Sequence, residues 1–286
     1  MSIFITGGTG TTGRDTIKAL QKRGATIKVG ARDLAKTKAL SGPNTDFVAF
    51  DYDKPETFAP AMKGCHTMLL LTGFDRFAHE QATQLIDAAA TAGVKHVVKL
   101  SAQGADSIPG IMVGRWHRTA ERYLTASGLG WTVLRPGAFA SNFGTFWAQS
   151  IKAEGKIYLP LGGAKVPWID PRDTAEVLAK VLTEGGHVGK TYELTGPEAL
   201  DTHQVAKALS EATGKTITYV DVPEQAAKEG MKAAGMPDWA VTGMGELYAV
   251  WKAGWASSVS NTTEMLLGRK GGTFAQWAKD NANMFK

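Results

Sequence analysis

The chain has 286 residues, of which 43% are hydrophobic and 21% are charged, a balance that is ordinary for a globular protein and excludes the disordered and fibrous classes. The formal net charge of +5 comes from scattered Lys and Arg residues without a long basic block, so we expect no nucleic-acid partner. Cys65 is the single cysteine, which excludes an intramolecular disulfide and cysteine-based zinc sites, and we expect no metal.

The first residues, MSIFITGGTGTTGRDTIKALQKRG, combine a short β-favouring run at 3–5, a glycine-rich turn, and apolar residues at helical spacing. Glycines in such a turn permit positive φ and let a pyrophosphate approach the backbone, and the N–H groups at the start of the helix can bind it. The alternative is a tight turn without a ligand. The residues predicted to hold the cofactor here are Gly7, Thr9, Gly10, Thr11, Thr12 and Gly13.

Strands and helices then alternate along the chain. Strands are expected at 25–32, 45–50, 66–73, 94–101 and 131–137, and helices at 33–42, 55–64, 79–93 and 117–128. Several of these strands are apolar throughout, as expected when helices cover both faces of a parallel sheet. The pattern predicts an α/β, Rossmann-like, doubly wound fold.

After residue 137 the alternation loosens. Helices are expected at 139–155, 170–186, 201–214, 224–235 and 245–255, and strands at 190–196 and 216–222. We therefore expect a dinucleotide-binding domain over 1–150, which the segment 171–196 rejoins, and a smaller, mainly helical substrate lobe over most of 151–286.

The end of the second strand bears on the choice between NAD and NADP. An acidic residue there binds the ribose 2′-OH, whereas an arginine accepts a 2′-phosphate. The chain has both Arg32 and Asp33, but Asp33 also begins a helix and has a capping role there, so we expect NADP(H) to be preferred over NAD(H). Further cofactor contacts are predicted after the third and fourth strands, at Asp51, Thr72, Gly73 and Phe74; for Asp51 the alternative is a turn cap.

Several segments together resemble the NmrA-like branch of the atypical short-chain dehydrogenase/reductases. They are ITGGTGTTG, the arginine after the second strand, FDYDKPETF, AGVKHVVKLS, HRTAERYLTASGLGWTVLRPGAFASN and LGRKGGTFAQWAKDNANMF. The resemblance covers nearly the whole chain. It implies a cofactor-binding protein related to NADPH-dependent quinone, azo-dye and triphenylmethane-dye reductases, and also to redox sensors that bind the cofactor without known turnover.

The usual short-chain dehydrogenases carry Tyr-x-x-x-Lys on the helix after the fifth strand, and the lysine there lowers the tyrosine pKa. This chain has His117 and Glu121 instead, a spacing that resembles the NmrA-like pattern. His117 is a candidate proton donor, and its alternative is a contact with Glu121 that anchors the helix. Ser101 is the other catalytic candidate, and its alternative is a satisfied turn hydroxyl. Tyr248 and Lys252 also match Tyr-x-x-x-Lys, which we interpret as accidental.

Aromatic residues gather in two places, after the sixth strand and near residue 250. Such side chains suit a flat conjugated acceptor, although aromatic stripes at helical spacing also occur in cores and subunit contacts. The predicted substrate contacts are Phe139, Asn142, Phe143, Trp147, Tyr248 and Trp251; Phe146 and Trp255 belong to the same two groups.

We therefore expect an NADPH-dependent oxidoreductase that transfers hydride to a planar quinone, azo dye or triphenylmethane dye. The alternative is an NADP(H)-binding redox sensor without turnover. The chain begins without a signal-peptide pattern and has no run of about 18 apolar residues, so we expect a cytoplasmic protein without a membrane segment. A homodimer is possible.

Overall fold

The computed structural model describes residues 2–286, which form two compact units. The first unit extends to Asp106 and also includes Gly114–Arg135 and Pro171–Glu193, whereas the second consists of Ser107–Val113, Pro136–Asp170 and Leu194–Lys286. From the sequence, residues 136–150 are expected in the first domain. In the structure they belong to the second unit, because Ala140, Phe143 and Trp147 are buried in that unit's core.

A seven-stranded sheet forms the centre of the first unit, with the strand order β3-β2-β1-β4-β5-β6-β8. Its strands are β1 Ser2–Ile5, β2 Thr26–Ala31, β3 Thr45–Ala49, β4 Thr67–Leu70, β5 His96–Leu100, β6 Gly130–Pro136 and β8 Lys190–Leu194. The pairs from β3 to β6 are parallel, and β1 aligns Ile3 with both Ile27 of β2 and Thr67 of β4. The predicted Rossmann-like fold is confirmed, including the return of β8 to this sheet.

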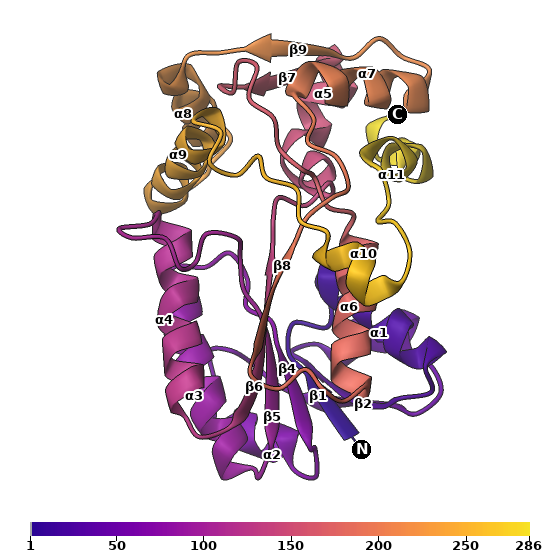
Figure 1. Ribbon diagram of the computed structural model, residues 1–286, viewed down its shortest axis with the longest axis vertical. Helices are drawn as coiled ribbons and strands as arrows, with labels where there is room; N and C mark the ends of the chain where they lie inside the picture. The colour runs from indigo at the N-terminus through magenta and orange to yellow at the C-terminus, as the bar shows by residue number, and fades with distance from the viewer. Residues whose placement is uncertain (1) are drawn as a thin grey trace. The chain divides into compact units, whose positions relative to one another are not determined.

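Helices cover both faces of the sheet (Figure 1). Helices α1 and α6 pack against each other on one face, while α2, α3 and α4 contribute side chains to a shared core with β1, β4 and β5 on the other face. The bounds are α1 Thr11–Lys22, α2 Phe58–Met62, α3 Ala78–Thr91, α4 Met112–Ala126 and α6 Pro171–Thr183. The apolar strands predicted from the sequence are apolar because both of their faces are buried here.

Two short helices of the first unit differ from the simple α-helices expected. Leu34–Leu40 (η1) is a 3-10 helix capped by Asp33, and Pro55–Thr57 (η2) is a 3-10 turn that leads into α2. Helix α4 begins five residues before the expected start at His117. The capping role of Asp33 is confirmed, because its carboxylate accepts a hydrogen bond from the Ala35 N–H at 3.0 Å.

The second unit is mainly helical and contains a small two-stranded parallel sheet, β7-β9. Its elements are the π-helix η3 Phe143–Trp147, α5 Ala148–Glu154, β7 Lys156–Leu159, α7 Thr202–Thr213, β9 Thr218–Asp221, α8 Glu224–Ala233, α9 Asp238–Lys252, α10 Thr262–Leu267, α11 Phe274–Asp280 and the 3-10 helix η4 Ala282–Phe285. Strand β7 was not expected from the sequence, because it pairs with β9, a strand about sixty residues further along the chain.

Aromatic side chains form much of the core of the second unit. The ring of Phe143 lies 4.8 Å from those of Trp147 and Trp168 and 5.3 Å from that of Phe274, centroid to centroid. Trp168 extends this contact to Trp251 at 5.2 Å. These rings therefore tie η3 to α9 and α11 within one packed cluster.

Across residues 2–286, no helix combines the length and the apolar character needed to cross a membrane.

Candidate functional site

The strand order of the first unit reverses between β1 and β4, which are neighbours although β2 and β3 lie between them in sequence. In open α/β sheets, ligands bind beyond the carboxyl ends of the strands at such a reversal. The glycine loop follows β1, and Thr72 and Gly73 follow β4, so the fold brings these two predicted segments to the same edge of the sheet.

The structure of the protein itself favours glycine at several positions of the loop, including 7 and 13. Gly7 has φ +61°, in the left-handed region, and its carbonyl accepts a hydrogen bond from the Gly10 N–H at 3.0 Å. A Cβ on Gly13 would lie 2.3 Å from the Gly7 carbonyl oxygen and 2.7 Å from the Gly8 Cα. Glycine at position 13 thus lets the first turn of α1 pack directly on the loop.

Gly10 differs, because no protein atom requires the absence of its side chain. A Cβ there would meet only the Gly7 carbonyl oxygen, at an ordinary 3.4 Å, and its φ is −74°. Gly10 is exposed and stands directly before α1, whose N-terminus has no side-chain cap. Open space beside uncapped helix N–H groups is the arrangement that a pyrophosphate needs, so the loop fits a dinucleotide.

The neighbouring threonines border the same space. Thr9 and Thr11 are exposed and Thr12 is partly buried. The Thr9 carbonyl accepts a hydrogen bond from Arg14 Nε at 2.7 Å, which braces the loop with a cation that the sequence analysis did not single out. Arg14 adds positive charge beside the predicted phosphate position.

A buried hydroxyl joins the ends of β1 and β4. Thr6 Oγ1 accepts from the Leu71 N–H at 2.8 Å and donates to the Leu71 carbonyl at 2.9 Å. The Tyr52 hydroxyl donates to the same carbonyl at 2.5 Å, and burial raises the pKa of Tyr52 to about 12. Thr6 and Tyr52 were missed by the sequence analysis, although a threonine that directly follows an apolar strand and precedes the glycines was a usable signal.

The predicted ribose-side residues lie at strand ends of the first unit. Arg32 follows β2, is exposed, and among residues 2–286 has no hydrogen bond or ion pair, whereas Asp33 caps η1 and lies 3.6 Å from Lys36 Nζ. Asp51 accepts from the Asp53 N–H at 3.2 Å, the turn cap considered as its alternative. Gly73 is exposed, with nothing within 4 Å of an added Cβ. Phe74 next to it is 44% exposed.

A buried polar network links β5, α4 and β6. Ser101 Oγ donates to Glu121, and Arg135 forms a bidentate pair with the same carboxylate, with Nε at 3.1 Å and Nη2 at 2.6 Å. Arg135 also contacts Asp106 at 2.7 Å and Glu193 at 3.3 Å. The hydrogen bonds with Glu121 raise the pKa of Arg135, and burial raises the pKa of Glu193.

His117 pairs with a lysine rather than with Glu121. Lys99, fully buried in β5, lies with Nζ 3.0 Å from His117 Nδ1 and 3.1 Å from the Leu100 carbonyl. Burial lowers the pKa of Lys99 to about 8, with Glu121 opposing the shift, and burial together with the Lys99 charge lowers the pKa of His117 well below its usual value. A contact with Glu121 was considered as the alternative role of His117. In the structure His117 contacts Lys99, whereas Glu121 contacts Ser101 and Arg135.

Ser101 and His117 lie in one region of the first unit. Ser101 contacts Glu121, His117 contacts Lys99, and the charge of Glu121 acts on Lys99. Ser101 follows the carboxyl end of β5, the edge of the sheet where ligands bind in this fold. Lys99 and Arg135 were not among the site residues expected from the sequence. For Lys99 the signal was present, because a lysine inside the apolar run VVKL of a buried strand needs a partner.

Most of the predicted substrate aromatics lie in the core of the second unit. Phe143 is fully buried, and Trp147, Tyr248 and Trp251 are also buried, the core position considered as their alternative. By contrast, Phe139 and Asn142 are partly exposed. Phe146 and Trp255 are more exposed, at 41% and 79% of their surface. Phe139 and Asn142 therefore retain surface that a ligand can contact.

Tyr248 and Lys252 do not form a catalytic pair. Burial raises the pKa of Tyr248, the opposite of what an activated tyrosine requires, and Lys252 Nζ pairs with Glu224 at 3.4 Å. The interpretation of this Tyr-x-x-x-Lys as accidental agrees with that geometry.

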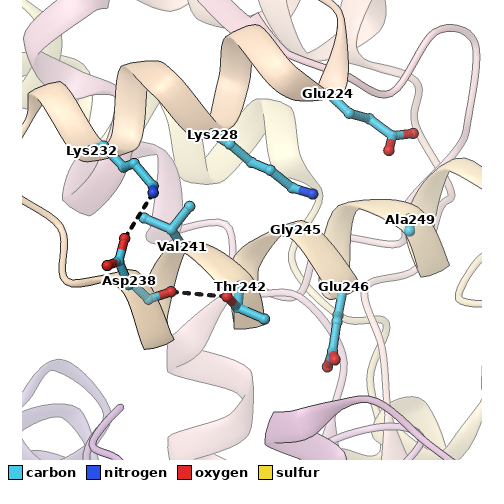
Figure 2. A pocket seen from close by; sticks show the side chains of 9 residues that line it. All are labelled: Glu224, Lys228, Lys232, Asp238, Val241, Thr242, Gly245, Glu246 and Ala249. Carbon is cyan, nitrogen blue, oxygen red and sulfur yellow. Dashed lines mark hydrogen bonds and ion pairs between the residues drawn. The ribbon is translucent and has the colours of Figure 1, made fainter.

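A cavity of about 480 Å³ lies between α8 and α9 in the second unit (Figure 2). Its charged lining includes Lys232, paired with Asp238 at 2.9 Å, and Lys228, whose stem lies over Gly245. None of the predicted site residues lines it: Tyr248 and Trp251 lie on the opposite, buried side of α9.

A model of the NmrA-like family matches residues 1–261. An NAD(P)H azoreductase from Xenophilus azovorans is 37% identical over 283 residues, covering 99% of both chains. An NADPH-dependent quinone oxidoreductase from Escherichia coli, solved with NADPH, superposes with a TM-score of 0.87 at 29% identity, covering 97% of this chain and 99% of that one. A triphenylmethane reductase from Citrobacter, solved with NADP(H), gives 0.86 at 26% identity, covering 99% and 100%.

Proposed function

The chain belongs to the NmrA-like family, and from this membership and the glycine-loop site we propose that it is an NAD(P)H-dependent oxidoreductase that reduces quinone or dye acceptors. The observation that carries the proposal is the similarity to the azoreductase over 99% of both chains. The quinone and triphenylmethane reductases of similar fold belong to the same class of reaction.

The cofactor side of the proposal rests on the first unit. Gly7 and Gly13 shape the loop, and Gly10 leaves open space before the uncapped N-terminus of α1 for the pyrophosphate. Bound there, the nicotinamide cofactor supplies the hydride. We assign the 2′-phosphate of NADPH to Arg32, because its guanidinium is exposed and forms no ion pair within residues 2–286, while Asp33 is engaged in capping η1.

The acceptor side rests on residues with accessible surface. Phe139 offers an aromatic ring and Asn142 a polar amide, and both are partly exposed. The buried rings Phe143, Trp147 and Trp251 act indirectly, by fixing the segment that carries these two residues.

The test is oxidation of NADPH and NADH, followed optically, with benzoquinones, naphthoquinones, azo dyes and a triphenylmethane dye. We expect turnover with at least one of these acceptor classes and a higher kcat/KM with NADPH than with NADH. Cofactor binding without reduction of any acceptor would contradict the proposal and favour the alternative of a redox sensor without turnover.

A further inference from the structure

The strongest unexplained feature of the first unit is the buried pair of Lys99 and His117. Lys99 has no exposed surface, yet within the described residues 2–286 its side chain has only two hydrogen-bond partners, one ring nitrogen and the carbonyl of the next residue. Burying an ammonium is costly unless its hydrogen bonds compensate.

The contact fixes the protonation of the imidazole. An ammonium only donates hydrogen bonds, so His117 Nδ1 must accept from Lys99 and must carry no proton. The neutral ring therefore carries its proton on Nε2. His117 is partly exposed whereas Lys99 has no exposed surface, so His117 is the residue of the pair that lies nearer to solvent.

Building on the proposed function, we infer that Lys99 and His117 form a proton relay for acceptors that need a proton together with hydride. Quinones and azo groups gain two electrons and one hydrogen from hydride and then need a proton on oxygen or nitrogen. His117 gives its Nε2 proton to that atom, and Nδ1 takes a proton from Lys99 Nζ. The lysine is left as a neutral amine and the ring as the Nδ1–H tautomer.

The relay resets through His117, the partly exposed residue of the pair. Nε2 takes a proton from water, and the Nδ1 proton returns to the Lys99 amine, so one solvent proton is consumed in each cycle. Lys99 acts on the acceptor only through His117 and is a positioning residue, whereas His117 is the proton donor.

The surrounding charges favour a proton on Lys99 at neutral pH. Glu121 of α4 is the carboxylate that supports the ammonium, and it is shared with Ser101 and Arg135. Arg135 of β6 is in turn neutralised by Asp106 and Glu193 as well. Because the pKa of Lys99 is lowered to about 8, the relay should lose its proton source as the pH rises past that value.

Acceptors that differ in proton demand provide the test. A cationic triarylmethane dye becomes neutral on taking hydride and needs no proton, whereas a quinone or an azo dye needs one. We expect Lys99→Met and His117→Gln to lower kcat with the quinone or azo dye by roughly a hundredfold, the lower end of what a positioned general acid contributes. With the triarylmethane dye, kcat should be unchanged, as should KM for NADPH.

Lys28→Met is the matched control. Lys28 is also a strand lysine whose amine donates to a backbone carbonyl, that of Lys63 at 2.7 Å, and no hydrogen bond joins it to a histidine in the described part of the chain. This variant should behave as the wild type with every acceptor.

A second readout needs neither cofactor nor turnover. In the full chain with ¹⁵N-labelled histidine, NMR should show His117 as the neutral Nε2–H tautomer from pH 6 to pH 8, with His117→Gln providing the assignment. In Lys99→Met, the hydrogen bond that holds His117 in the Nε2–H tautomer is lost, so both tautomers should be populated, and the pKa of His117 should rise. An Nδ1–H tautomer in the wild type would overturn the relay.

Equal losses with both kinds of acceptor, or no loss with either, would also overturn the relay while leaving the proposed function standing. A wild-type protein that reduces no acceptor would instead overturn the proposed function and the relay's catalytic role with it. The NMR spectrum would then still decide whether the Lys99–His117 pairing exists.

Discussion

Arg32 illustrates how a single unpaired charge can set cofactor choice. Its guanidinium is exposed at the end of β2 and has no partner among residues 2–286. A 2′-phosphate placed there would gain charge-assisted hydrogen bonds that a 2′-hydroxyl cannot match. Neighbouring Asp33 is already used by the Ala35 N–H, so its carboxylate is less available to a ribose.

We predict that Arg32→Ala raises KM for NADPH by about tenfold or more, in line with the loss of one charge-assisted interaction, and changes KM for NADH little. The measurement is steady-state kinetics with both cofactors and one acceptor. Lys22→Ala, which removes an exposed cation at the far end of α1, serves as the control. Equal effects on the two cofactors would show that Arg32 does not meet the 2′-phosphate.

Lys99 should also affect the pH dependence of the free energy of unfolding, independently of catalysis. Burial lowers its pKa from 10.5 to about 8, so between these pH values the unfolded chain keeps a proton that the folded chain has lost. Stability due to this group therefore rises with pH across that window, and below pH 8 the buried charge costs about 3 kcal/mol.

Lys99→Met removes this cost. The free energy of unfolding of the variant, relative to wild type, should decline by about 3 kcal/mol between pH 8 and pH 10.5. Urea unfolding at several pH values measures it, with Lys28→Met as the control. A difference that does not vary with pH would mean that the Lys99 pKa is not lowered.

At the level of elements, the glycine loop and α1 act as one structure in which each glycine has a separate task. Gly13 lets the helix pack on the loop, and Gly10 keeps the space before the helix open. Substitution of Gly13 should therefore affect the stability of the protein, whereas substitution of Gly10 should affect cofactor binding.

Gly13→Ala should destabilise the protein by about 1–3 kcal/mol, because its Cβ would lie 2.3 Å from the Gly7 carbonyl oxygen. Gly10→Ala should leave the free energy of unfolding within about 0.5 kcal/mol of wild type, yet weaken NADPH binding, because only a ligand needs that space. Urea unfolding and fluorescence titration with NADPH measure the two effects. Cofactor binding unaffected by Gly10→Ala would place the pyrophosphate elsewhere.

Local patterns predicted the elements of the first unit well because its strands are short apolar runs between clear turn signals. The same logic failed for β7, since Lys156–Leu159 is a strand only through its pairing with β9, far along the chain. The glycine loop was predictable because its chemistry lies within seven consecutive residues. The partner of His117 was not, because Lys99 reaches it only through the packing of β5 against α4.

On the scale of the whole molecule, the two units have separate cores but one interleaved chain. The backbone passes between the units near residues 106, 113, 135, 170 and 193, so neither unit is a continuous stretch. Four tryptophans, 147, 168, 251 and 277, are buried in the core of the second unit. Their fluorescence therefore reports chiefly on the unfolding of that unit.

Phe143→Ala should lower the free energy of unfolding by about 3–5 kcal/mol, because the ring is fully buried among Trp147, Trp168 and Phe274. Phe146→Ala, which removes a neighbouring ring that is 41% exposed, should cost much less. Urea unfolding followed by tryptophan fluorescence measures both. Similar losses would mean that Phe146 is also a core residue.

The same tryptophan signal tests whether the interleaved units unfold together. NADPH, which we place in the first unit, stabilises whatever unfolds with its site, by about 2.7 kcal/mol at one hundred times its Kd. Because the chain passes repeatedly between the units, we expect them to unfold together. The free energy of unfolding of the second unit, followed by tryptophan fluorescence, should then rise by this full amount. A transition that NADPH does not move would mean that the second unit unfolds while the cofactor site remains folded.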